Sequence, residues 1–249
     1  RGVAYEYMVA LANVVNADPW FTIPHMADDD YVRQAAILVK THLNSNLKPY
    51  VEYSNEAWNG GFSQLKWIQA KGLELGLSTD TTLALYRYFS QRTVEMVSIF
   101  RQVFGTEQAR VIGVMGSQAA NSWIGTQELN WQNAYQKVNA LAIAPYFGGS
   151  FGRSSTVGSL SVAELFSQIF STDLSKSYAW ITSNASLTNS LGISLIAYEG
   201  GQHLAGVGTV ANDTTVTNLF TTANADPQMG VAYAQYLQEW KKRGGKLFV

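Results

Sequence analysis

The chain has 249 residues, of which 47% are hydrophobic and only 14% charged, with a net charge of −1 at pH 7. That balance leaves no basic surface for nucleic acid or an anionic membrane, and no apolar run approaches the ~20 residues of a membrane-spanning helix. The chain has no cysteine, so disulfides and thiolate metal sites are excluded. Such a chain fits a reducing compartment or a bacterial secreted protein, and of the two we expect a secreted or periplasmic protein.

Predicted strands and helices alternate through the first half of the chain. Apolar residues at helical spacing indicate helices, and short apolar runs indicate buried strands. The triplet Asp28-Asp29-Asp30 suits a helix N-terminus. The predicted elements are a helix at 2–16, a strand at 19–25, a helix at 28–44, a strand at 47–55, helices at 62–75 and 80–104, and a strand at 109–117.

The second half continues the alternation. It is predicted to contain a helix at 126–138, a strand at 140–147, helical structure at 161–187, a strand at 194–201, a helix at 226–244 and a strand at 246–249. Nearly continuous apolar strands are typical of a parallel sheet buried on both faces. Repeated βαβ units predict an α/β barrel or a doubly wound sheet. No Gly-x-Gly-x-x-Gly follows a strand, which argues against a dinucleotide-binding domain.

The number of strands bears on the fold. A (β/α)8 barrel has eight parallel strands, whereas this chain offers about six, opening on a helix and stopping on a strand. We therefore predict an α/β fold that is an incomplete (β/α)8, TIM-barrel-like domain. Residues 1–249 would form this single partial catalytic domain, without roughly the first two strands and the last helix.

Two glutamates follow predicted strands. Glu56 comes in YVEYSNEAWN after the strand at 47–55, and Glu199 comes in SLIAYEGG after another strand. In α/β barrels the C-terminal strand ends form the active-site face, so we expect both carboxylates to converge. Two converging carboxylates are the usual equipment for glycoside hydrolysis, with separations of about 5–5.5 Å for retention and about 6.5–9.5 Å for inversion of the anomeric configuration.

Asn55-Glu56 after one strand, followed 143 residues later by Glu199 after another, resembles the clan A glycoside hydrolases. The resemblance implies a retaining (β/α)8 enzyme, of which this chain spans strands three to eight. It implies that Glu56 is the general acid/base, that Glu199 is the nucleophile and that Asn55 binds the sugar 2-hydroxyl. Tyr146, at the end of the strand matching strand six, would orient Glu199.

Other side chains would complete the substrate site. His25 and His203 would line the pocket, and Trp58 and Trp20 are candidate platforms for sugar rings. No cofactor and no metal is implied. The sequence departs from the clan pattern because it offers neither the arginine after strand two nor the tryptophan after strand eight.

Several alternatives stay open. Each histidine and tryptophan can instead be a core residue, and Asp28 to Asp30 can simply begin a helix. The chain could be a truncated, non-catalytic carbohydrate-binding barrel, or a metal-dependent barrel hydrolase. A carbohydrate is the expected partner; low charge and many aromatics favour a neutral one. Open strand edges would also permit a homo-oligomer.

Overall fold

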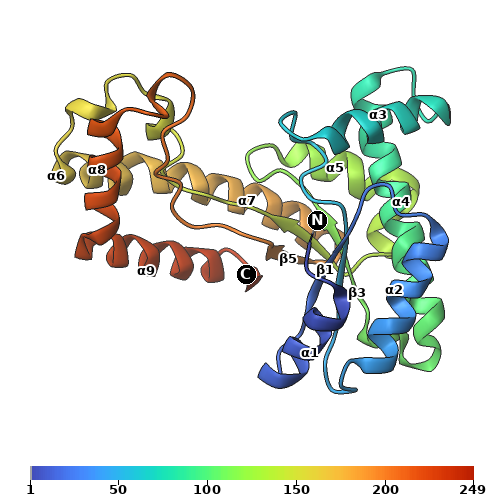
Figure 1. The fold of residues 1–249 in the computed structure, drawn as a ribbon. Helices are drawn as coiled ribbons and strands as arrows, with labels where there is room; N and C mark the ends of the chain where they lie inside the picture. The colour runs from blue at the N-terminus through green and yellow to red at the C-terminus, as the bar shows by residue number, and fades with distance from the viewer. Residues whose placement is uncertain (1) are drawn as a thin grey trace. The chain divides into compact units, whose positions relative to one another are not determined.

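The computed structural model describes residues 2–249, and Figure 1 traces the alternation of strands and helices along them. One six-stranded parallel sheet has the order β1-β2-β3-β4-β5-β6, so each strand pairs with the next along the chain. The strands are β1 (Trp20–Ile23), β2 (Tyr50–Tyr53), β3 (Ile112–Gly116), β4 (Ala140–Ile143), β5 (Ser194–Ala197) and β6 (Gly245–Phe248). This confirms the predicted α/β fold with the strand order of a partial (β/α)8 barrel.

The helices occupy most of the connections between strands. They are α1 (Tyr5–Val15), α2 (Asp29–His42), α3 (Ser63–Glu74), α4 (Thr81–Phe104), α5 (Ser122–Asn130), α6 (Val162–Gln168), α7 (Leu174–Leu191), α8 (Thr214–Ala225) and α9 (Pro227–Lys242). Within residues 2–249, no helix is both long and apolar enough to cross a membrane.

The contacts divide the chain into two compact units. The first contains β1 to β3 with α1 to α4, most of α5 and the start of β4, together with residues 191–194. The second contains α6 to α9 with most of β5 and all of β6. The prediction that residues 1–249 form a single catalytic domain stays a prediction.

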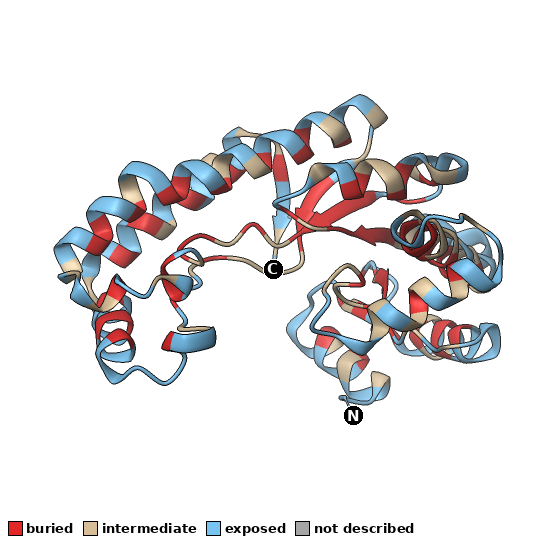
Figure 2. Ribbon diagram, turned by 90° about the horizontal axis from the view of Figure 1, so that it is seen from above, coloured by how far each residue is buried: buried red, intermediate tan, exposed pale blue. Residues whose placement is uncertain are grey.

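In the first unit, α4 is the central helix. Asp80 caps its N-terminus by accepting a hydrogen bond from the Leu83 N–H at 2.8 Å. Its buried face packs beside β2 and β3, and Met96 and Phe100 are fully buried. Asp28 likewise caps α2 through the Tyr31 N–H, so the acidic triplet begins a helix as predicted. Figure 2 shows the buried residues concentrated in the strands and on inner helix faces.

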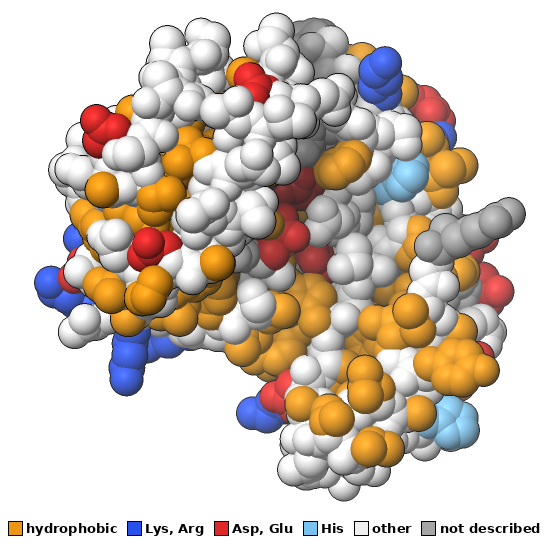
Figure 3. All heavy atoms as spheres, turned by 60° about the vertical axis from the view of Figure 1, so that its left-hand side comes forward, with side chains coloured by type: hydrophobic (Ala, Val, Ile, Leu, Met, Phe, Trp, Pro, Cys, Tyr) orange, Lys and Arg blue, Asp and Glu red, His pale blue; other side chains and the backbone are white. Residues whose placement is uncertain are grey.

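Helix α1 is apolar on both faces. Val9 and Ala12 are buried on one face, whereas Tyr7, Leu11 and Val14 are 73%, 62% and 84% exposed on the other. Figure 3 shows hydrophobic side chains gathered over this helix, at the lower right of the view. Glu6 and Asn13 are polar residues of this helix. Its exposed apolar side chains form a surface of the kind that marks interaction sites, and α1 precedes β1, which is the first strand of the sheet order.

In the second unit, helices α6 to α9 enclose a hydrophobic core. Its largest fully buried side chains include Phe147, Phe166 and Tyr236, and the Tyr236 hydroxyl donates to the Pro145 carbonyl at 2.6 Å. The helical region predicted at 161–187 forms two α-helices, α6 and α7, joined by a π-helical turn at Ile169–Asp173.

Three predicted elements need correction, and one helix was missed. The strand predicted at 194–201 ends at Ala197. Helix 126–138 is wrong in its bounds, because α5 begins at Ser122 and the chain kinks at Gln132 and Asn133, whose φ angles are +47° and +56°. Strand 140–147 ends at Ile143, because Pro145 has no N–H to donate to a ladder. Helix α8 was not predicted: its threonines have low helix propensity, but Asp213 caps it and its apolar face is buried.

Candidate functional site

The chain leaves β2 through an uncommon backbone conformation. Ser54 and Glu56 have φ angles of +58° and +47°, a left-handed region that non-glycine residues enter at a cost of order 1–3 kcal/mol. Such residues cluster at active sites and ligand clamps. The Ser54 N–H donates to the Ile23 carbonyl at 2.8 Å, so the turn starts at the last pairing of β1 with β2. These two left-handed residues turn the chain sharply, so that Asn55 and Glu56 lie directly after the strand.

The Glu56 carboxylate is held by its own turn. The Asn59 side-chain amide donates to Oε2 of Glu56 at 2.6 Å, and the Asn59 N–H donates to the Glu56 carbonyl at 2.9 Å. The Asn59 side-chain oxygen accepts from the Gly61 N–H, and Gln64 donates to the Asn55 carbonyl at 2.8 Å. Sequence reasoning missed Asn59 and Gln64 as supports of the site; the turn-forming Asn-Gly-Gly at 59–61 was the available signal.

A second carboxyl, that of Glu52, lies within β2 itself, upstream of Glu56. It is 1% exposed, and it accepts from Trp20 Nε1 at 2.9 Å and from the Thr22 hydroxyl at 3.4 Å. A β-carbon on Gly116 of β3 would lie 2.6 Å from Oε1 of Glu52, so any larger residue there would force the Glu52 carboxylate to shift. Trp20 also stacks on Tyr50, with ring centroids 5.5 Å apart. Trp20 is therefore a structural partner of Glu52, and a sugar-platform role is not supported for it.

His25 follows β1 and lies against α3. Its carbonyl accepts from the Tyr53 hydroxyl at 2.7 Å, and its ring meets the edge of Trp67 at 5.4 Å. Burial lowers the pKa of the His25 imidazole, so the ring is neutral at pH 7. Trp58 is half-buried on the same turn as Glu56.

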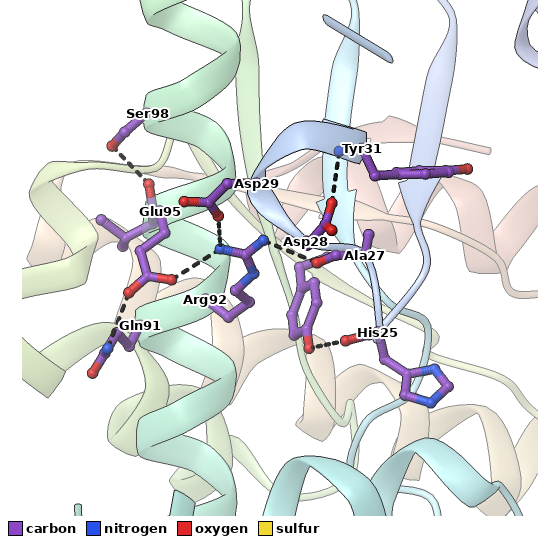
Figure 4. Close-up of polar contacts among 11 residues, drawn as sticks. His25, Ala27, Asp28, Asp29, Tyr31, Gln91, Arg92, Glu95 and Ser98 are labelled. Atoms are coloured by element: carbon purple, nitrogen blue, oxygen red, sulfur yellow. Dashed lines mark hydrogen bonds and ion pairs between the residues drawn. The ribbon is translucent and has the colours of Figure 1, made fainter. Parts of the chain in front are cut away.

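The segment after His25 is fixed to α4 by one arginine. Figure 4 shows the guanidinium of Arg92 between Asp29 and the Ala27 carbonyl, with Glu95 on its other side. The distances are 2.6 Å to Asp29, 2.9 Å to Ala27 and 3.1 Å to Glu95. The Arg92 side chain is only 9% exposed. This network sets the path of the chain from β1 into α2, and with it the position of His25.

In the second unit, Tyr146 and His203 lie together. Their ring centroids are 5.2 Å apart in an edge-to-face arrangement. The loops that carry them pair through the Phe147 N–H to the Gly201 carbonyl at 2.9 Å and the His203 N–H to the Phe147 carbonyl at 2.7 Å. The predicted bond from Tyr146 to Glu199 stays a prediction.

Glu199 is half-buried, two residues after β5. Two glycines follow it, for different reasons. A β-carbon on Gly200 would lie 2.6 Å from the Phe248 ring, whereas Gly201 has a φ angle of +109°, which side chains rarely adopt. Both predicted catalytic glutamates therefore follow strand ends, as expected. Glu56 belongs to the first unit and Glu199 to the second, and their convergence stays a prediction.

The Tyr146–His203 pair borders a pocket of about 400 Å³ within the second unit. Its wall on α7 and the preceding turn includes Asp173, Lys176, Ser177 and Trp180, and Ser150 and Arg153 line it from the loop after β4. Among residues 2–249, no three acidic or histidine side chains gather closely enough to hold a metal ion.

Solved structures provide a likeness at the level of fold. A Cellulomonas fimi endo-beta-1,4-mannanase double mutant is 11% identical with a TM-score of 0.51, and the match covers 98% of this chain and 50% of that one. The catalytic domain of a GH26 endo-beta-1,4-mannanase from Bacillus sp. JAMB-750 is 10% identical with a TM-score of 0.31, over 100% of this chain and 72% of that one.

No family model and no curated protein matches the sequence. The chain spans about half the length of the Cellulomonas mannanase. At 11% identity a likeness shows the fold alone. The fold it shows is the one that the strand order indicates, part of a (β/α)8 barrel.

Proposed function

We propose that the chain carries the two catalytic carboxylates of a retaining glycoside hydrolase that cleaves β-linked glycosides. The observation that carries the proposal is the strained exit of β2, which holds Glu56 in a left-handed conformation and against the Asn59 amide. A cost in backbone energy at a strand end is typical of active sites. The second carboxylate, Glu199, follows another parallel strand and is followed by two closely packed glycines, Gly200 and Gly201.

In this mechanism the reaction takes two displacements. Glu199 attacks the anomeric carbon while Glu56 protonates the departing oxygen, which leaves a glycosyl-enzyme ester on Glu199. Glu56, now a carboxylate, then removes a proton from water as the water attacks the same carbon. Asn55 would bind the sugar 2-hydroxyl, an interaction that strengthens in the transition state. His25, Trp58, Tyr146 and His203 would bind and orient the sugar.

The test is hydrolysis of nitrophenyl glycosides and β-linked polysaccharides by the native chain and by Glu56→Ala and Glu199→Ala. Both variants should lose activity, while Glu6→Ala, which removes an exposed carboxylate on α1, should keep it. Azide should then separate the two roles. Azide replaces the missing nucleophile in Glu199→Ala, so a β-substrate yields an α-glycosyl azide. In Glu56→Ala it attacks the glycosyl-enzyme and yields a β-glycosyl azide.

If Glu56→Ala instead yields the α-glycosyl azide and Glu199→Ala the β-glycosyl azide, the roles of the two glutamates are reversed. Activity that survives Glu199→Ala would refute the mechanism. If the native chain binds oligosaccharides but turns none over, the chain is a non-catalytic carbohydrate-binding barrel instead.

A further inference from the structure

The pocket in the second unit carries more positive charge than the rest of the chain suggests. Arg153 and Lys176 line it, and Asp173 is the single acidic side chain on its wall. For the chain as a whole, 17 basic side chains face 18 acidic ones. The local excess of one positive charge therefore contrasts with a near-neutral molecule, and with the neutral substrate that composition favours.

The one acidic group is committed to structure. The Asp173 side chain is 6% exposed and accepts from the Gly148 N–H and from the Ser150 hydroxyl at 2.7 Å. The Lys176 ammonium is 3.8 Å from Asp173, at the limit of an ion pair, and its side chain is 56% exposed. Asp173 therefore anchors the loop after β4, while the cations of Lys176 and Arg153 face solvent at the pocket.

The pocket walls are closely packed. The Ser177 hydroxyl donates to the Tyr146 carbonyl at 2.7 Å, which ties α7 to the loop. The Val207 N–H donates to the Gly152 carbonyl at 2.9 Å, and a β-carbon on Gly152 would lie 1.9 Å from the Ala205 carbonyl. The pocket is thus formed by segments that hold one another in place, as preformed ligand sites are.

The remaining lining suits a sugar ring. Trp180 and Tyr146 are half-exposed aromatic side chains, and His203 is exposed beside Tyr146. Aromatic rings offer apolar faces with polar handles. Arginine is a donor in a fixed fork geometry that matches a carboxylate. Asp173 closes a π-helical turn, a feature that is frequent at functional sites.

We propose that this pocket binds an acidic sugar, with a hexuronate carboxylate placed between Arg153 and Lys176 and the ring against Trp180. This inference deepens the proposed function by naming its substrate class as a β-linked glycan that contains uronate residues. It rests on the proposed function in that respect alone. The sugar carboxylate is ionised at pH 7, because carboxyl groups of this kind titrate near pH 3–4.

The test compares oligosaccharides that differ only in charge. The probes are β-1,4-mannotetraose and β-1,4-tetramannuronate, and cellotetraose and its 6-oxidised uronate, titrated calorimetrically into the Glu199→Ala chain so that no turnover occurs. We expect at least one uronate to bind about fivefold to tenfold tighter than its neutral partner at low salt, because two solvent-accessible ion pairs contribute modestly. Higher salt should reduce the preference.

Variants locate the preference. Arg153→Gln and Lys176→Gln should each reduce it, and the double variant should remove it while binding of the neutral sugar persists. Lys241→Gln removes the same charge from the exposed face of α9 and should leave the preference intact. Equal affinities for the paired sugars, no detectable uronate binding, or a preference that survives in the double variant would overturn the proposal.

The two proposals can fail separately. Hydrolysis that requires Glu56 and Glu199 but shows no uronate preference would support the catalytic function and reject the acidic subsite. A uronate preference that depends on Arg153 and Lys176, in a native chain that hydrolyses nothing, would do the reverse.

Discussion

Replacing Glu128 by glutamine should remove the part of the pH dependence of stability that this buried carboxyl contributes. Glu128 lies on α5 with 0% exposure, and neither of its carboxyl oxygens has a well-aligned hydrogen bond within residues 2–249. Burial raises the pKa of the Glu128 carboxyl well above its ordinary value of 4.5, and the Ser117 hydroxyl nearby opposes that shift only in part. In the folded state burial therefore favours the neutral acid, whereas the unfolded chain ionises this carboxyl at neutral pH.

The sign follows from proton linkage. Above the unfolded pKa and below the folded one, the folded state binds more protons than the unfolded state, so the free energy of unfolding falls as pH rises. The slope across that window is about 1.4 kcal/mol per pH unit for one group. The stabilisation is fully present below pH 4.5 and is lost as pH rises through the folded pKa.

Glutamine removes the ionisation but brings an amide that also lacks partners, at a cost of roughly 1–3 kcal/mol. At pH 4 we therefore expect Glu128→Gln to be less stable than the native chain. At pH 7 it should be the more stable of the two, so the two stability curves cross.

Urea unfolding followed by tryptophan fluorescence at pH 4, 5.5, 7 and 8.5 measures both curves. The control is Glu6→Gln, which changes an exposed carboxyl on α1 and should shift stability equally at every pH. A difference between Glu128→Gln and the native chain that does not change with pH would refute the reasoning, because Glu128 would then be ionised in the folded protein.

Three further outcomes are expected. Gly116→Ala should cost about 1–3 kcal/mol by overpacking against Glu52, and adding Glu52→Asp should recover part of it in urea unfolding; an unchanged midpoint for Gly116→Ala would contradict that packing. Arg92→Met should cost about 1–2 kcal/mol, since its partners Asp29 and Glu95 are 67% and 44% exposed and their pairs are worth little, whereas Arg33→Met on the exposed face of α2 should cost little; equal costs would show that the network does not stabilise the fold. Light scattering at high micromolar concentration should detect self-association that Leu11→Glu weakens and Val231→Glu does not, because Leu11 lies on the apolar face of α1 near the β1 edge; a monodisperse native monomer would exclude this association.

The fold was predictable where one strong pattern determined an element. Helix α4 was expected at 80–104 and begins and ends within one residue of that range, because its apolar spacing, its Asp80 cap and Gly105 all agree. Helix α8 was not predictable in the same way. Its threonines favour extended structure, and only burial of Val216, Leu219 and Phe220 selects the helix.

The candidate site was likewise predictable only where a local pattern determined the position of a residue. The positions of Glu56 and Glu199 after strands could be predicted, since a strand end is a local feature. The left-handed φ angles at Ser54 and Glu56 could not, because they depend on pairing with β1 and on the Asn59 contact. Buried Glu52 and Glu128 were also missed, because a glutamate is exposed by default and nothing adjacent in sequence marks an interior one.

The π-helical turn at Ile169–Asp173 has a consequence for insertions and deletions. Such a turn contains one residue more than an α-helical path would need. Deleting one residue there would allow α6 and α7 to join as a regular helix, and because the wide turn absorbs the additional residue, the residues on either side would keep nearly the same faces. Lys176 and Trp180 would then stay on the pocket wall, whereas the turn that carries Asp173 would be rebuilt. Relatives of both lengths should therefore share the side chains that α7 contributes to the pocket, and differ in how Asp173 anchors the loop after β4.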